Sequence, residues 1–137
     1  MKRTAVAFLG LVLAGAPAGA DSYIGFQSPT GNIHCSIYVW GGGAEARCDL
    51  TALTPSYTRA PADCDLDWGS SFAVNDTGKG VLACVGDTVR DPQNPVLGYG
   101  EAVSLGGISC VSAKTGITCT NAEGHGFSVA KARQTLF

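Results

Sequence analysis

Six cysteines constrain this chain more than any other feature. They are Cys35, Cys48, Cys64, Cys84, Cys110 and Cys119. Zinc sites usually place paired thiolates roughly two to four residues apart, whereas the closest pair here, Cys110 and Cys119, is nine residues apart. An even set of widely spaced cysteines in an exported chain indicates a disulfide framework. We therefore expect three disulfides and no zinc site.

The N-terminus has the three zones of a secretory signal. Lys2 and Arg3 precede an apolar run over residues 5–14, and the small residues A-G-A occupy positions 18–20. This pattern predicts a cleaved signal peptide over residues 1–20 and a mature chain that begins at Asp21. The apolar run is shorter than the about 20 residues that span a bilayer, so we expect no membrane insertion.

The predicted mature chain, residues 21–137, is long enough for one domain with a modest core. Its first cysteine, Cys35, lies too far from the cleavage point to carry a lipid anchor, which excludes a lipoprotein. We expect a secreted or periplasmic protein.

Charge excludes one class of partner. Removal of Lys2 and Arg3 leaves seven basic residues against eleven acidic ones, so the formal charge changes from −2 to −4. Nucleic-acid binding normally requires a basic patch, and the basic residues here are scattered. The expected partner is an unidentified extracytoplasmic ligand or protein, and no cofactor is indicated.

The stretch Phe26–Cys48 reads as two consecutive hairpins. If residues 40–43 form the second loop, Cys35 lies opposite Cys48, and the pairs on that face are apolar or cysteine. The pairs on the other face are polar or amphipathic, and they include His34 with Asp49. Such alternation is typical of a half-buried antiparallel hairpin.

If residues 113–116 form a loop, setting the flanking residues opposite each other likewise pairs Cys110 with Cys119. Cys64 and Cys84 then pair by elimination. With 19 Gly and 6 Pro, the composition favours short strands and tight turns. The predicted fold is all-β: a small, disulfide-stapled antiparallel β-sandwich or partly open barrel of short hairpins. The last residues, 131–137, are expected to form a helical turn.

Several motifs carry a family resemblance. They are F-Q-S-P-T-G-N-I-H-C at Phe26–Cys35, R-C-D at Arg47–Asp49, C-D-L-D-W-G at Cys64–Gly69, G-D-T at Gly86–Thr88, Tyr99-Gly100, and a closing segment with G-H-G-F at Gly107–Phe127. In this order the chain resembles a bacterial family of small secreted six-cysteine proteins whose domain has no known function. The resemblance implies an exported, disulfide-bridged β domain and no particular substrate.

Two histidines raise the possibility of an enzyme. His34 opposes Asp49 with Ser36 two residues along, but a nucleophilic serine needs a constrained turn and an oxyanion hole, which a mid-strand Ser36 lacks. We therefore favour a surface His–Asp pair over a catalytic triad. His125 lies between two glycines, where a structural turn is the simpler interpretation. A small secreted hydrolase or metal-dependent enzyme that uses His34, Asp49 and His125 is the alternative function.

Asp63, Asp65 and Asp67, together with Asp87, form the other acidic group of interest. They could supply oxygen ligands for calcium, but the spacing lacks the glycine and distal glutamate of a calcium loop, and a solvated face is favoured. No metal or catalytic residue is assigned from the sequence.

Aromatic residues give the favoured functional hypothesis. Tyr38 and Trp40 lie on the polar face of the hairpin that carries Cys35 and Cys48, where exposed rings can mark a binding surface. Alternatively, residues 91–100 could cover them, with Tyr99 packed onto the rings. The leading hypothesis is a non-catalytic binding or structural module. Its candidate surface is formed by His34, Tyr38, Trp40, Asp49, Tyr99 and His125.

Overall fold

Two antiparallel sheets form the protein in a computed structural model that describes residues 21–137. The predicted signal peptide therefore lies outside the described residues. The first sheet contains β1 (Ser22–Gln27), β2 (Ile33–Trp40), β3 (Gly43–Leu50), β4 (Ser71–Asn75) and β5 (Val81–Leu82). The second contains β6 (Ala102–Leu105), β7 (Ile108–Ala113), β8 (Gly116–Thr120), β9 (Gly126–Val129) and β10 (Gln134–Leu136). In each sheet the strand order follows the chain order, and neither sheet closes on itself.

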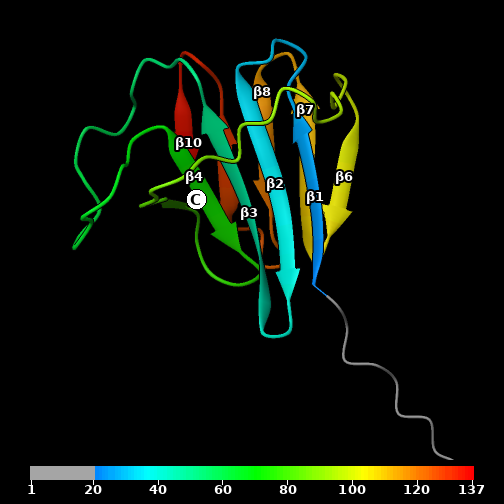
Figure 1. The fold of residues 1–137 in the computed structure, drawn as a ribbon, viewed down its shortest axis with the longest axis horizontal. Helices are drawn as coiled ribbons and strands as arrows, with labels where there is room; N and C mark the ends of the chain where they lie inside the picture. The colour runs from blue at the N-terminus through cyan, green and yellow to red at the C-terminus, as the bar shows by residue number, and fades with distance from the viewer. Residues whose placement is uncertain (1–20) are drawn as a thin grey trace, which may run out of the picture.

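The first sheet lies in front of the second in Figure 1, which gives an open sandwich. The all-β prediction is confirmed, and the described residues contain no helix. The helical turn expected at residues 131–137 is wrong, because β10 forms there and pairs with β9. No helix of residues 21–137 is long and apolar enough to cross a membrane.

The predicted cysteine pairing is confirmed. Cys35 pairs with Cys48 across β2 and β3, and Cys110 pairs with Cys119 across β7 and β8. Their Cα atoms are 4.1 Å and 4.0 Å apart, which places both bridges where the strands come closest. The third disulfide joins Cys64 to Cys84.

The core lies between the two sheets and includes both hairpin disulfides. All four cysteines of these bridges are fully buried, as are Phe72 of β4 and Phe127 of β9. Each inner face is apolar at alternate positions, because successive side chains of a strand point to opposite sides.

The outer face of the first sheet is covered over part of its length. Residues 85–97, which we call the strap, cross in front of β3 and β2 and reach β1 (Figure 1). There the Gln27 N–H donates to the Pro95 carbonyl at 3.0 Å, and the Leu97 N–H donates to the Gln27 carbonyl at 2.8 Å. The Gln27 side chain also donates to the carbonyls of Pro92 and Asn94.

This cover corrects one expectation from the sequence. His34 and Asp49 lie opposite each other as predicted, but the surface His–Asp pair is wrong, because their exposed fractions are only 2% and 7%. Ser36 of the same face is buried too. The polar side chains at this end of the face therefore form an interior layer beneath the strap.

Candidate functional site

A buried arginine organises the polar layer. Arg47 of β3 donates through Nε and Nη2 to the two carboxylate oxygens of Asp49, at 2.9 Å and 3.0 Å. It also donates through Nη1 to Asp87 Oδ1 and through Nη2 to the Asp87 carbonyl, both at 2.8 Å. Asp49 accepts two more hydrogen bonds, from the Thr88 hydroxyl and the Val89 N–H. We call this set the Arg47 network; it fastens the strap to the sheet.

The charges of the network stabilise one another. Burial alone would lower the pKa of Arg47, but its hydrogen bonds to Asp49 and Asp87 outweigh burial and raise that pKa above its usual value. The hydrogen bond from Arg47 lowers the pKa of Asp87, whose carboxylate is largely exposed. Both groups are therefore held in their charged forms at neutral pH.

A small hollow of about 200 Å³ adjoins the network at one end of β3. Three residues of the network line it, and so do three others, Asp67, Trp68 and Arg90. Asp49 already accepts four hydrogen bonds from the protein, so it has little capacity left for a ligand. The geometry therefore indicates mainly a structural role for Asp49.

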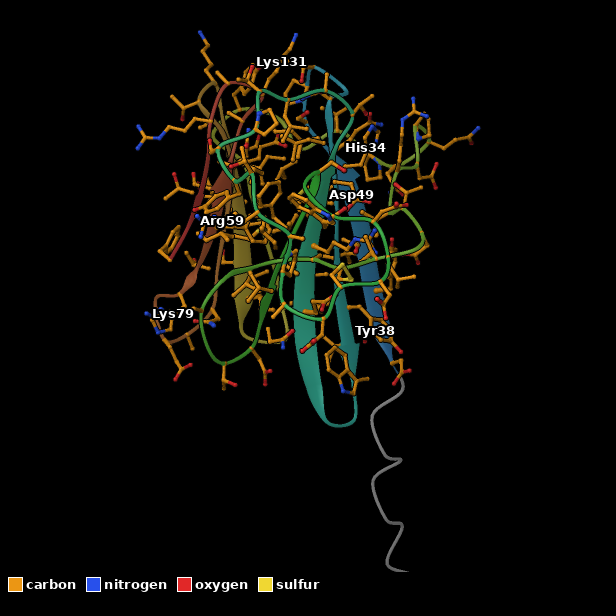
Figure 2. All side chains as sticks on the ribbon, turned by 90° about the vertical axis from the view of Figure 1, so that its left-hand side faces the viewer. His34, Tyr38, Asp49, Arg59, Lys79 and Lys131 are labelled. Carbon is orange, nitrogen blue, oxygen red and sulfur yellow. A yellow bond between two sulfur atoms is a disulfide. The ribbon has the colours of Figure 1, made fainter. Side chains whose placement is uncertain are left out.

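His34 is buried beside this network without being part of it. Its Nε2 lies 2.8 Å from the Gly31 carbonyl; because a carbonyl only accepts, Nε2 must carry the proton. Its Nδ1 is buried and has no hydrogen-bond partner among the described residues. Figure 2 shows His34 and Asp49 at neighbouring positions, but the carboxylate of Asp49 is bonded to Arg47, Thr88 and Val89 rather than to the imidazole.

His125 lies elsewhere, in the connection between β8 and β9 of the second sheet. It lines a different hollow with Lys79 and Phe137, and its N–H donates to the Asn121 side chain. Residues 21–137 thus bring His34 and Asp49 together as cross-strand neighbours but do not bring His125 to them.

The acidic residues do not gather into a metal site in the described part of the chain. No group of three or more potential metal ligands is found among residues 21–137. Asp63, Asp65 and Asp67 lie in the long connection between β3 and β4, and Asp87 is engaged by Arg47.

Beyond the strap, the same outer face carries exposed aromatic rings. Tyr23 of β1 pairs with Tyr38 of β2, and the rings of Tyr38 and Trp40 stack with centroids 5.6 Å apart. We call Tyr23, Tyr38 and Trp40 the aromatic patch; their exposed fractions are 56%, 39% and 38%. Figure 2 shows Tyr38 at the end of the sheet away from His34 and Asp49.

Three carboxylates border the aromatic patch. The Tyr38 hydroxyl donates to Asp21, which raises the pKa of that tyrosine. Glu45 lies opposite Tyr38, and burial raises its pKa. Asp76 lies near Trp40, because a Cβ added at Gly43 would be 3.1 Å from the Trp40 ring and 3.2 Å from the Asp76 carboxylate.

Tyr99 is separate from this patch. It lines a hollow with Ser28 and Asn32, next to the beginning of β2, whereas Tyr38 and Trp40 lie near the end of that strand. The strap reaches the sheet at Gly25 and Gln27, and so leaves the rings of Tyr38 and Trp40 uncovered. The candidate surface inferred from the sequence is therefore divided among several parts of the molecule.

Two residues that shape these sites, Tyr23 and Arg47, were not identified from the sequence. Tyr23 could have been found by extending the predicted pairing before β2 toward the N-terminus, since the pairing of Phe26 with Cys35 places Tyr23 opposite Tyr38. The buried role of Arg47 had one local signal, the carboxylate of Asp49 two residues along the same strand, but its second partner, Asp87, is 40 residues away.

These features define a disulfide-bridged, open β-sandwich with a strapped polar layer and an exposed aromatic patch. The chain belongs to a family of unknown function, DUF6636, whose model matches residues 5–137. No curated protein and no solved structure gives a significant match to the chain. The three disulfides are typical of an oxidising, extracytoplasmic environment.

Proposed function

We propose that this protein is a secreted or periplasmic binding module, exported by a cleavable signal over residues 1–20, and that the aromatic patch receives a positively charged group of its ligand. The observation that carries the proposal is the row of exposed rings of Tyr23, Tyr38 and Trp40 bordered by carboxylates. Large exposed rings on a rigid sheet are typical of binding surfaces.

The chemistry around the rings favours a cation. Ring faces attract ammonium and guanidinium groups, and the attraction increases beside carboxylates. Asp21, Glu45 and Asp76 lie around the rings, and none of them forms an ion pair with another residue in the described range. The excess of acidic residues in the mature chain also favours a cationic ligand over an anionic one at this surface.

Rigidity of the sheet supports the same function. The motifs of the family resemblance, Arg47–Asp49 and Gly86–Thr88, supply the residues that fasten the strap to the first sheet. A fixed strap keeps β1, β2 and β3 in place, and a preorganised surface loses less entropy when it binds.

Tryptophan fluorescence of the mature protein can test the proposal. The chain has two tryptophans, so a Trp68→Phe variant leaves Trp40 as the only reporter. Choline should quench or shift its emission saturably, whereas the neutral isostere 3,3-dimethylbutan-1-ol should bind more weakly. Because exposed cation–π contacts contribute about 0.5–1 kcal/mol each, Tyr38→Ala should weaken choline binding about two- to fivefold.

The matched control is Tyr99→Ala, an exposed tyrosine away from the patch. It should leave choline binding unchanged. Equal binding of choline and its neutral isostere, or equal effects of the two tyrosine variants, would refute a cation site at the aromatic patch.

A further inference from the structure

The hollow that Tyr99 lines with Ser28 and Asn32 lies at the end of the sandwich and differs in chemistry from the aromatic patch. It has a volume of about 510 Å³, within the usual range for small-molecule sites. Its wall combines the turn before β2 (Ser28, Thr30, Asn32), the turn between β7 and β8 (Lys114), and the segment after β9 (Lys131). Tyr99 completes the wall. We call this hollow the lysine pocket; loops from both sheets build it.

The charge of the lysine pocket is opposite to that of the chain. Two of the seven basic residues after position 20, Lys114 and Lys131, line it, and no aspartate or glutamate does. Neither lysine forms a salt bridge with another residue of the described range. In a chain of negative formal charge, the wall of this pocket therefore carries two positive charges and no negative one.

The framework of the pocket is held in place by hydrogen bonds. The Asn32 side chain donates to the Ala52 carbonyl at 2.9 Å and accepts from the Ala52 N–H at 2.8 Å. The Lys131 carbonyl accepts from the Thr54 N–H at 2.7 Å. Beside Tyr99, the Gly100 N–H donates to the Ser112 carbonyl at 2.7 Å. The backbone at Lys131 and beside Tyr99 is thus held in place, and Lys114 lies in the turn that the pairing of Ala113 with Gly116 closes.

Hydroxyl protons are available as well. Ser28 and Thr30 share one hydrogen bond, 3.1 Å long, while their oxygens also accept from the Ile33 and Asn32 N–H groups. One shared bond uses one hydroxyl proton, so the other remains free to donate. The Tyr99 hydroxyl is a further donor. Two ammonium groups together with hydroxyl donors are suited to an oxyanion.

We propose that the lysine pocket binds a small organic oxyanion, with its charged group between Lys114 and Lys131 and its body against Tyr99. The volume admits more than an inorganic ion, and the ring offers an apolar contact for a carbon skeleton. This site is distinct from the aromatic patch: Figure 2 shows Lys131 at the opposite end of the molecule from Tyr38.

NMR titration of the ¹⁵N-labelled mature protein tests this proposal with four probes: glucose 6-phosphate, citrate, inorganic phosphate and glucose. Glucose 6-phosphate or citrate should produce saturable shifts at Tyr99, Lys114 and Lys131. Inorganic phosphate should bind at least several-fold more weakly, and glucose should not bind. Lys114→Gln and Lys131→Gln should each weaken binding about tenfold, as expected for one charge-assisted hydrogen bond.

The matched control is Lys79→Gln, which removes an exposed lysine from a different hollow. It should leave the affinity unchanged, and it guards against a general effect of net charge. The proposal is overturned if none of the organic anions gives saturable shifts at these residues up to about 20 mM, or if Lys79→Gln weakens binding as much as the pocket variants. Equal affinity for inorganic phosphate and both organic anions would refute the role of Tyr99.

Discussion

Removal of the Asp49 carboxylate should be the most damaging single change in the polar layer. Asp49 is 7% exposed and accepts hydrogen bonds from Arg47 Nε and Nη2, the Thr88 hydroxyl and the Val89 N–H. In Asp49→Ala these donors lose their acceptor in the interior. Loss of one partner of a buried ion pair typically costs about 3–5 kcal/mol. Because Asp87 still compensates Arg47 in part, we expect about 3 kcal/mol.

Urea unfolding of the disulfide-intact protein can measure this loss. With a denaturant slope of about 1–3 kcal/mol/M, the unfolding midpoint of Asp49→Ala should fall by about 1–3 M. The matched control is Asp87→Ala, because Asp87 also bonds to Arg47 but its side chain is 79% exposed. That variant keeps its carbonyl acceptor, and it should lose no more than about 1 kcal/mol.

A second variant separates buried charge from general disruption. In Arg47→Met/Asp49→Ala both charges are gone, so the double variant should be less destabilised than the sum of the two single variants. A loss below about 1 kcal/mol for Asp49→Ala, or equal losses for Asp49→Ala and Asp87→Ala, would refute the reasoning.

Three further predictions concern Glu45, Asp87 and the glycines. Burial raises the pKa of Glu45, so the unfolded state releases this proton at lower pH and the ionised side chain costs stability at neutral pH. Glu45→Gln should therefore raise the free energy of unfolding at pH 7, and the gain should vanish below about pH 4; a gain that persists at pH 3 would exclude this cause. The pH dependence expected for Asp87 has the opposite sign. Because its pKa is lowered in the folded state, Asp87→Asn should lower the free energy of unfolding at pH 7, and this loss should disappear in acid. Urea unfolding over the same pH range checks it. A Cβ at Gly126 would overlap the Cys119 carbonyl of β8, whereas one at Gly41 meets nothing within 4 Å. Calorimetry should show that Gly126→Ala costs at least about 1–3 kcal/mol and that Gly41→Ala costs much less; similar melting temperatures would contradict the close approach of β8 and β9.

The two hairpins could be predicted because their information is local. The strands that carry Cys35 and Cys48 are joined by a short turn, so the alternation of apolar and polar residues fixes which side chains face each other. The same holds for Cys110 and Cys119. The Cys64–Cys84 bridge followed only because no other cysteines remained.

The burial of the outer face could not be predicted in the same way. The strap has no periodicity of its own, and its contacts join residues that are distant in sequence, such as Arg47 with Asp87 and Gln27 with Pro92. A polar side chain in a strand reads as exposed unless the segment that covers it is known. This is why the sequence alone predicts a surface position for His34 and Asp49, and why it carries no signal for the lysine pocket.

The strand β10 shows the same limit. It depends on β9 and on the connection between β3 and β4, since the Gln134 N–H donates to Ser56 Oγ and the Leu136 N–H donates to the Tyr57 hydroxyl. These partners are 78 and 79 residues away, beyond any local pattern.

The order of the disulfides has a consequence for how the chain matures. The six cysteines pair in chain order, the first with the second, the third with the fourth and the fifth with the sixth, over separations of 13, 20 and 9 residues. If such a chain enters an oxidising compartment N-terminus first, each pair can close before the following pair arrives, and no early bridge has to be reshuffled. Under that condition, an oxidase that joins consecutive thiols would suffice for maturation, without a disulfide isomerase.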